Sequence, residues 1–351
     1  MTLRPVSRKK TAGDPLPFSE AAQRYLEETQ RDPDAALTQQ TVGQSEAVFR
    51  LFKDFCRDAP LVDITRAEAG EFLSTVATLD RHWGRSPKTK ERSLEDLLEL
   101  YGGHPTGLSN RTLNRYASVL GVVFKWARKR GLHDGENPFE GQSRKGAKTR
   151  KTGWLPFTMA ELSTLLSSLR PQVAPNAHTV DTALAWAVWI GAYSGMRLNE
   201  ICSLDVADVR KEKGVWFFDV ADAKTEAGVR RVPVHSVLLE ADLLDYRKRV
   251  GSGSLWPGLK PGGPDRKLSW YTTKRFTRVR RGLGLTRDRL AFHSLRNNVG
   301  GALEAARVPE SEAVQILGHE KLSMSYAVYS LGLELPALKE VVEKIDYPTD
   351  A

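Results

Sequence analysis

The stretch VDTALAWAVWIGAYSGMRLNEICSL, residues 180–204, decides the fold of the C-terminal half of the chain. Its residues 180–193 are apolar almost all round, which is typical of a helix buried in a domain core. Gly195 then permits a sharp bend, and Arg197 opens a second helix with Glu200 one turn later. At this spacing we expect the Glu200 carboxylate to hold the Arg197 guanidinium in one orientation. The plainer alternative is an exposed, weak ion pair.

A β-hairpin is predicted after these two helices. Residues 215–220 and 229–234 are rich in β-branched and aromatic side chains, and they flank a polar turn at residues 222–228. Lys224 lies in that turn. The rest of this half has helical patterns, so the predicted fold class is mainly α with a small antiparallel β-sheet.

The N-terminal half has helical patterns throughout. Thr65 and Glu68 form a capping box, in which each side chain satisfies a free backbone N–H of the other residue. The last helix of this half is expected to begin after Ser109, to bury Trp126 among its apolar residues, and to end at Gly131.

The chain is long enough for two domains, since 351 residues exceed the roughly 250–300 that one core usually serves. The segment 141–153 is rich in Gly, Lys and Arg and has too little apolar content for a core of its own. We therefore expect a disordered arm (1–14), a helical domain (15–140), a basic linker (141–153), a mixed domain (154–332) and a tail helix (333–351).

The charge of the chain favours a polyanionic partner. The net charge is +9 and the pI is about 9.5. Residues 266–289 hold nine Lys or Arg against one acid, and residues 144–151 hold five with none. Clusters of this kind are typical of phosphate binding, although a merely basic surface is the ordinary alternative. The DNA-contact candidates are Arg144, Lys145, Lys148, Arg150, Lys151, Lys274, Arg275 and Arg278.

Several other classes of protein are disfavoured. No run approaches the roughly 18 apolar residues that cross a bilayer, and the first residues lack the apolar stretch of a secretory signal, so we expect a cytoplasmic protein without a membrane partner. Two cysteines, Cys56 and Cys202, are too few for a disulfide framework or a thiolate zinc cage. We expect chemistry without a cofactor or metal, unless other ligands hold the metal.

Two further short motifs follow in the C-terminal half. His293 and Arg296 stand three residues apart at a predicted helix start, so both project from one face. Gly318 and His319 come next, and Tyr329 follows ten residues after His319. Each motif alone is weak, because a surface Arg or a packed Tyr is common.

Taken in order, these motifs resemble the tyrosine recombinase (phage integrase) family. Members carry an Arg in a Gly-x-Arg-x-x-Glu context, a Lys on a β-hairpin, a His-x-x-Arg, a Leu-Gly-His and then a Tyr. The resemblance covers about residues 155–332 and implies that 154–332 is the catalytic domain. The helical domain 15–140 looks like the family's SAM-like core-binding domain, on topology more than on motif.

The resemblance assigns a role to each residue. Arg197 and Arg296 would grip the scissile phosphate, Tyr329 would attack it and form a 3′-phosphotyrosine bond, and His293 would be the base. Lys224 would protonate the leaving 5′-oxygen, and His319 would hydrogen-bond a non-bridging oxygen. Glu200 would orient Arg197 without reacting.

The chain departs from the family pattern at two places. Asn297 and Asn298 stand where members often have His-Thr, at positions outside the core chemistry. Tyr326 lies three residues before Tyr329 and is a rival nucleophile. The distance from His319 favours Tyr329, and Tyr326 is then interpreted as a packing residue.

The family implies a partner and an assembly. We expect double-stranded DNA with a specific recombination site, a homotetramer on that DNA, and possible DNA-bending accessory proteins. The tail packs in cis or in trans, and the sequence does not distinguish the two. Two alternatives to site-specific recombination stay open: relaxation of DNA by a type IB topoisomerase-like enzyme, and a catalytically silent DNA-binding regulator.

Overall fold

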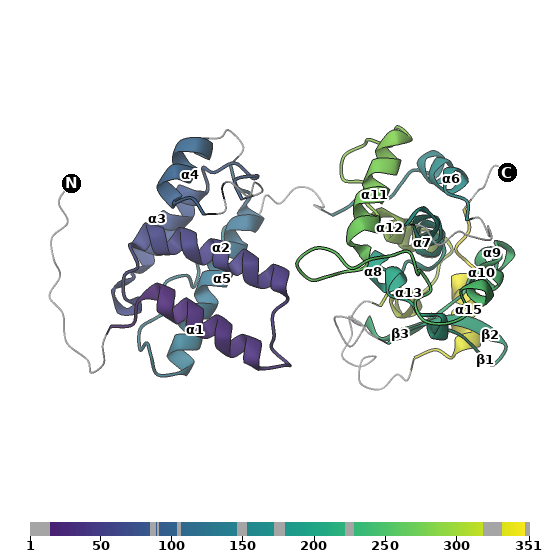
Figure 1. The fold of residues 1–351 in the computed structure, drawn as a ribbon, viewed down its shortest axis with the longest axis horizontal. Helices are drawn as coiled ribbons and strands as arrows, with labels where there is room; N and C mark the ends of the chain where they lie inside the picture. Colours follow the sequence, from purple (N-terminus) through teal and green to yellow (C-terminus); the bar gives the residue numbers. More distant parts are fainter. Residues whose placement is uncertain are drawn as a thin grey trace. The chain divides into compact units, whose positions relative to one another are not determined.

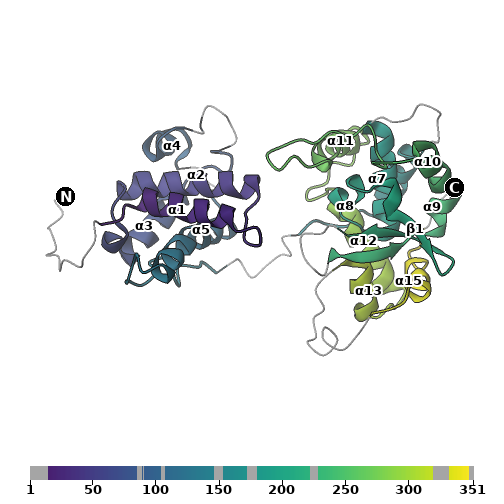
Figure 2. The same ribbon diagram turned by 60° about the horizontal axis from the view of Figure 1, so that its bottom comes forward.

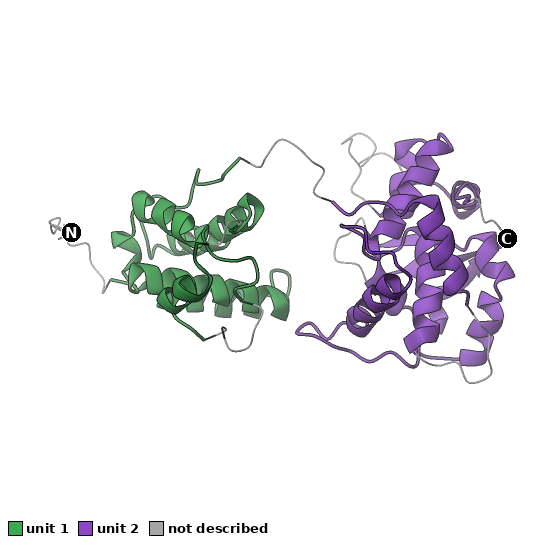
Figure 3. Cartoon of the chain, turned by 90° about the horizontal axis from the view of Figure 1, so that it is seen from above, with its two compact units in different colours: residues 1–150 green, residues 151–351 purple. Residues whose placement is uncertain are grey.

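The computed structural model describes residues 15–84, 89, 91–103, 107–145, 153–171, 180–221, 228–318 and 332–347. The predicted arm lies outside these residues, as do Lys148, Arg150, Lys151, Lys224, His319, Tyr326 and Tyr329. The chain divides into two compact units, Met1–Arg150 and Lys151–Ala351, which are shown in different colours in Figure 3.

Unit 1 is helical in its described part. Its helices are α1 (Phe18–Arg31), α2 (Gln39–Cys56), the 3-10 turn η1 (Leu61–Asp63), α3 (Arg66–Val76), α4 (Leu94–Tyr101) and α5 (Asn110–Lys129). Thr65 and Glu68 make the predicted capping box at the start of α3. Gly131 follows α5 with φ +68°, the left-handed conformation that glycine adopts freely.

Aromatic side chains form the core of unit 1. Phe52 is fully buried at the centre, with its ring 4.8 Å from that of Phe18 and 5.0 Å from that of Phe72. These pairs are close to perpendicular, an arrangement that aromatic rings prefer. Trp126 was predicted to be buried, and that prediction is wrong. Its indole reaches the edge of the core, where Nε1 donates to Glu28 at 3.1 Å, and it stays half-buried.

Unit 2 is built around α7 (Val180–Ser194), which lies near the middle of the unit in Figures 1 and 2. The other helices are α6 (Met159–Ser168), α8 (Leu198–Cys202), η3 (Val206–Asp208), α9 (Ser236–Glu240), α10 (Leu243–Val250), α11 (Ser269–Gly282), α12 (His293–Ala305), α13 (Glu310–Leu317) and α15 (Leu335–Val342). The helix α7 packs against α8, α9, α11 and α12. Because neighbours cover it on several sides, its sequence is apolar on several faces.

The sheet of unit 2 has three antiparallel strands in the order β1-β2-β3. They are β1 (Val209–Glu212), β2 (Val215–Val220) and β3 (Arg230–Pro233). The sequence predicted β2 and β3 as a hairpin, and the fold class of mainly α with a small antiparallel sheet is confirmed. The strand β1 was not predicted, because three of its four residues are charged, as is common on a sheet edge.

The tail helix α15 packs on its own domain. It contacts β3 and α13, and Figure 2 shows it beside α13. Just beyond it, Glu343 accepts hydrogen bonds from the backbone N–H of Ser236 at 2.9 Å and from its hydroxyl at 2.7 Å. The Tyr347 hydroxyl donates to the Ala192 carbonyl at 2.9 Å, at the end of α7. In the single chain, therefore, the tail packs in cis.

Candidate active site

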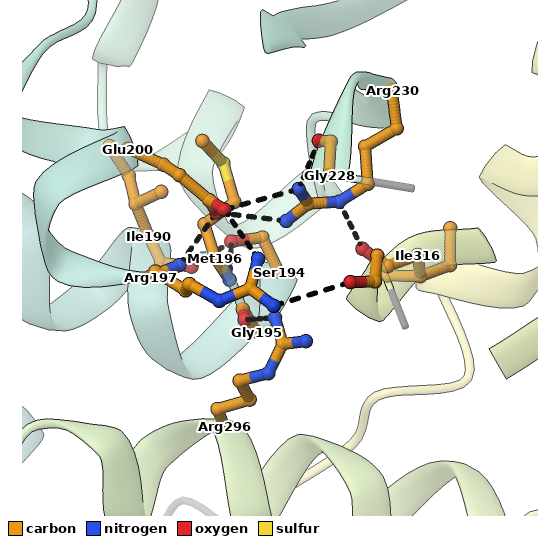
Figure 4. Close-up of polar contacts among 11 residues, drawn as sticks. Ile190, Ser194, Gly195, Met196, Arg197, Glu200, Gly228, Arg230, Arg296 and Ile316 are labelled. Carbon is orange, nitrogen blue, oxygen red and sulfur yellow. Dashed lines mark hydrogen bonds and ion pairs between the residues drawn. The ribbon is translucent and has the colours of Figure 1, made fainter. Parts of the chain in front are cut away.

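The predicted contact between Arg197 and Glu200 is present at the start of α8. The Arg197 Nη1 donates to Glu200 Oε1 at 2.7 Å, and the Arg197 backbone N–H donates to Oε2 at 2.8 Å. The Glu200 side chain is only 8% exposed, whereas that of Arg197 is 41% exposed. The carboxylate is thus buried, and the guanidinium that it holds is partly exposed; Figure 4 shows the contact between them.

The bend before Arg197 requires a glycine. Gly195 has φ +67°, and a Cβ there would lie 2.6 Å from Leu317 and 3.2 Å from Val299. Backbone conformation and close packing both exclude a side chain at this position. The bend therefore brings the Gly195 carbonyl and Arg197 next to α12 and to the end of α13.

Arg296 projects from α12 toward this bend. Its side chain is buried, with the whole residue 4% exposed, and Nη1 donates to the Gly195 carbonyl at 2.8 Å. Its Nη2 is buried and has no hydrogen-bond partner among the described residues. Burial, with the nearby charges of Arg197 and Arg230, lowers the pKa of Arg296 to about 9. An unpaired donor on a buried cation is costly, so this position favours an anion.

His293 lies one turn before Arg296 on α12, where the charges of Arg296 and Arg197 both act on its imidazole. Although much of the residue is exposed, neighbouring protein atoms partly desolvate the imidazole, and this desolvation is the main cause that lowers its pKa. The positive charges of Arg296 and Arg197 lower the pKa further. The imidazole is therefore neutral at pH 7 and available to accept a proton.

Arg230 belongs to the same cluster, and the sequence analysis missed it. It donates from Nη2 to Glu200 Oε2 at 2.9 Å and from Nη1 to Oε1 at 3.3 Å. Its side chain is only 6% exposed. A signal was available in the strand: residues two apart share one face, so Arg230 lies on the face of the buried Val232. A cation on a buried face calls for a partner.

Glu200 is ionised by these contacts. Burial by itself raises the pKa of the Glu200 carboxyl, but the hydrogen bonds and charge of Arg230, joined by the contacts of Arg197, outweigh it. The net result is a lowered pKa. Arg197 and Arg230 thus share one carboxylate with Arg296 nearby, and the surplus positive charge of the three guanidiniums suits a phosphate.

The end of α13 is held against the cluster. Gly318 caps the helix with φ +63°, and its carbonyl accepts a hydrogen bond from Arg197 Nη2 at 3.2 Å. His319 is the next residue and lies outside the described residues, as do Lys224 and Tyr329. Among the predicted site residues that are described, Arg197, Glu200, His293 and Arg296 come together.

Asn298 explains one departure from the family pattern. It is buried, and its side chain makes both hydrogen bonds to the Phe157 backbone, accepting from the N–H at 2.9 Å and donating to the carbonyl at 2.7 Å. Its neighbour Asn297 donates to the Trp154 carbonyl at 2.6 Å. Both asparagines fasten the segment before α6 to α12, which is a structural role.

The described DNA-contact candidates fall in two places. Arg144 and Lys145 lie against α5: the Arg144 N–H donates to Asn114 at 2.8 Å, and the Lys145 carbonyl accepts from Asn110 at 2.9 Å. The start of the predicted linker is thus anchored to unit 1.

The other described candidates lie on α11. The Lys274 ammonium lies 4.5 Å from the ring centre of Trp270, and Arg275 pairs with Asp181 at 2.6 Å. Arg278 belongs to the same helix. Each of Lys274 and Arg275 already has a partner on its own unit, so DNA contact would have to compete with or add to these interactions.

Two absences apply only to the described part of the chain. There, no group of three or more His, Cys, Asp or Glu side chains is arranged to hold a metal ion. In the same part, no helix combines the length and apolar character needed to cross a membrane.

The described part of unit 2 is thus a helix-rich α+β domain in which the guanidiniums of Arg197, Arg230 and Arg296 lie near one another and near the His293 imidazole. Residues 157–331 match the profile of the Phage integrase family. The chain therefore belongs to the phage integrase, or tyrosine recombinase, family through this domain.

Solved structures of integrases share the fold. A Tn1549 transposon integrase in complex with a circular intermediate DNA matches with a TM-score of 0.58 and 16% identity, over 94% of this chain and 100% of the other. A lambda integrase dimer bound to a core site matches with a TM-score of 0.56 and 17% identity, over 89% and 77%. A lambda integrase tetramer bound to a Holliday junction matches with a TM-score of 0.56 and 18% identity, over 89% and 77%. No curated protein sequence matches this chain.

Proposed function

We propose that this chain is a site-specific DNA recombinase that cuts and rejoins strands through a 3′-phosphotyrosine bond at Tyr329. The observation that carries the proposal is the pair of guanidiniums at the bend: Arg296, buried with an Nη2 that no described residue pairs, and Arg197, held by Glu200. Two forks of this kind suit the two non-bridging oxygens of one phosphodiester. The membership of the catalytic domain in the phage integrase family supports the same reading.

The proposed cleavage step needs no cofactor. The Tyr329 hydroxyl loses its proton to His293 while its oxygen bonds to phosphorus, and the bond from phosphorus to the 5′-oxygen breaks. Lys224 gives its proton to that oxygen, which leaves as a 5′-hydroxyl. Arg197, Arg296 and His319 stabilise the charge that builds on the non-bridging oxygens. The phosphotyrosine bond retains the energy of the broken linkage, so a 5′-hydroxyl of another strand reverses the step.

We further propose how the chain engages DNA. The helical domain 15–140 acts as a SAM-like core-binding domain, the basic linker 141–153 follows the phosphate backbone, and the domain 154–332 carries the chemistry. The target is a specific site on duplex DNA, within a homotetramer that DNA-bending proteins assist. Integrases of similar fold crystallised on DNA, including a lambda integrase tetramer on a Holliday junction, support this assembly.

A trapping experiment tests the proposal. The protein is incubated with fragmented genomic DNA of its source organism, denatured with SDS, and the DNA that stays covalently attached is sequenced. A duplex of the captured sequence is then prepared with a nick close to the cleavage site. After cleavage, the short strand between the nick and the cleavage site dissociates, so the covalent adduct cannot reverse and accumulates. We expect the adduct with the wild-type protein and with Tyr326→Phe, and none with Tyr329→Phe.

The contrary outcomes are distinct. A Tyr329→Phe protein that still forms the adduct overturns the assignment of the nucleophile. DNA binding without any adduct indicates a silent regulator. Relaxation of supercoiled plasmids that lack the captured sequence indicates a topoisomerase-like enzyme.

A further inference from the structure

Arg230 is a buried cation whose contacts link three elements. From β3 it reaches Glu200 on α8, donates from Nε to the Ile316 carbonyl on α13 at 2.8 Å, and donates from Nη1 to the Gly228 carbonyl at 2.8 Å. Figure 4 shows these contacts around the guanidinium. Burying an arginine costs stability unless its donors are satisfied, and here they are satisfied by groups next to the candidate site.

Glu200 is shared between two guanidiniums of different exposure. Each of its oxygens accepts one hydrogen bond from Arg230 and one from Arg197, the latter through Nη1 and the backbone N–H. Arg230 is almost completely buried, whereas the Arg197 side chain is 41% exposed. The buried Arg230 therefore fixes the Glu200 carboxylate from the core side of the cluster. Arg197 donates to that carboxylate from only one of its side-chain nitrogens, Nη1.

Removing Arg230 would change what Glu200 does to Arg197. A carboxylate with a single guanidinium neighbour favours the two-pronged pair, which takes up one donor edge and most of the charge of that guanidinium. Arg197 would then be drawn inward and neutralised. With Arg230 in place, the charge of Glu200 is divided between two cations, and Arg197 keeps a surplus for an anion.

The end of α13 depends on the same side chain. A Cβ on Gly318 would lie 2.8 Å from Arg230 Nη1, so the guanidinium packs directly against this glycine backbone. Arg197 holds the Gly318 carbonyl from the other side of the cluster. Arg230 thereby sets the spacing between α8 and the helix end to which Arg197 is bonded.

We propose that Arg230 is a positioning residue for DNA strand cleavage, acting through Glu200 to keep Arg197 aimed at the scissile phosphate. This inference rests on the proposed recombinase function. Arg230 itself does not contact the DNA. Arg230 is thus a buried residue that takes no part in the reaction itself but positions Arg197, which does.

The test uses the full chain and the nicked duplex of the captured sequence. Four variants are compared with the wild type: Arg230→Gln, Glu200→Gln, the double variant, and Arg230→Lys. Arg231→Gln is the matched control, because Arg231 is the next residue on β3, pairs with Glu212 and is exposed. The measurements are the rate of adduct formation at saturating DNA, the Kd for the duplex, and the Tm.

A positioning role predicts a separation of rate from binding. Arg230→Gln and Glu200→Gln should each slow adduct formation about 30-fold or more, since small misplacements of a catalytic group have effects of this order. The Kd should stay within about threefold, because phosphate contacts elsewhere dominate affinity. Arg230→Lys, which keeps the charge without the fork, should recover part of the rate. Arg231→Gln should match the wild type.

The double variant is the decisive measurement. If Arg230 acts through Glu200, the double variant should be no more than about threefold slower than the slower single variant, because residues that act as one unit are not additive. The inference is overturned if the rate loss of the double variant equals the product of the two single losses. It is also overturned if Arg230→Gln cleaves at the wild-type rate, or if its rate and its affinity for DNA fall together. A wild-type protein that forms no adduct instead overturns the proposed function. Should Arg230→Gln not fold, Arg230→Lys and the double variant carry the same comparison.

Discussion

The two units of this chain bury different kinds of side chain. Unit 1 packs aromatic rings around Phe52, and in its described residues the buried polar side chains are Ser45, Thr89 and His133. Unit 2 also has a large apolar core, but it buries Arg296 and places Arg230 against Glu200 inside the domain. Apolar burial stabilises a fold directly, whereas buried cations usually cost stability. The core of unit 1 therefore stabilises its fold directly, whereas the buried cations of unit 2 are expected from the proposed active site rather than from stability.

Arg296→Met gives the sharpest test of that contrast. The change removes a guanidinium from the candidate phosphate site, so adduct formation should fall about 10³-fold, as with the loss of one transition-state donor elsewhere. The free energy of unfolding should fall by no more than about 1 kcal/mol, because one lost hydrogen bond is offset by removal of a buried charge that the described residues pair incompletely. Adduct kinetics and denaturant unfolding check both parts. A large loss of stability with little loss of rate would mean that Arg296 is structural.

Phe52→Ala is the converse change in unit 1. The fully buried ring has neighbours at 4.8 and 5.0 Å, so its loss should destabilise unit 1 by about 3–5 kcal/mol. Hydrogen exchange should show lost protection in α1, α2 and α5 and unchanged protection in α7. Val62→Ala is the control, because Val62 is 60% exposed, and its effect should stay below about 0.5 kcal/mol. Equal loss of protection in α7 would contradict independent cores.

The pH profile tests His293. Partial desolvation and the charges of Arg296 and Arg197 hold its pKa below the ordinary value of 6.5. A base acts in its neutral form, so cleavage at low DNA concentration should fall as the pH drops through a midpoint below 6.5. It should reach a plateau between that midpoint and the pKa of about 9 of Arg296. His293→Gln should lose about 10²-fold in rate at pH 7 and should lack this acid limb. A midpoint above 6.5 in the wild type would contradict the assignment.

Arg275→Gln should have the smallest effect. Its ion pair with Asp181 joins side chains that are 36% and 62% exposed, and such pairs contribute at most about 1 kcal/mol. The Tm should therefore hardly move. If Arg275 also contacts DNA, the Kd should rise at low salt and the slope of log Kd against log salt should become shallower by about one ion. A salt slope equal to that of the wild type would remove Arg275 from the DNA contacts.

Local features of this chain were predicted from the sequence because their causes lie within a few residues. The capping box at Thr65 fixes a helix start by contacts three residues away, and the Arg197–Glu200 pair is one turn of a helix. The strand β1 was not predicted, because charged edge strands lack an apolar alternation. In the structure, Lys213 and Gly214, both with positive φ, join it to β2 by a tight turn.

What only the tertiary structure decided is the choice of distant partners. Glu200 pairs with Arg230 as well as with Arg197, and Arg296 donates to the Gly195 carbonyl. Trp126 is half-buried, with its indole bonded to Glu28. Periodicity shows which face of an element is buried, but it does not show which other element covers that face. The sequence by itself therefore determined the fold class, the β2–β3 hairpin and the pairing of Arg197 with Glu200, but neither the strand β1 nor the place of Arg230 in the cluster. The packing of α8, α12, α13 and β3 decided which cations share one carboxylate, and that Arg296 keeps a buried Nη2 without a partner among the described residues.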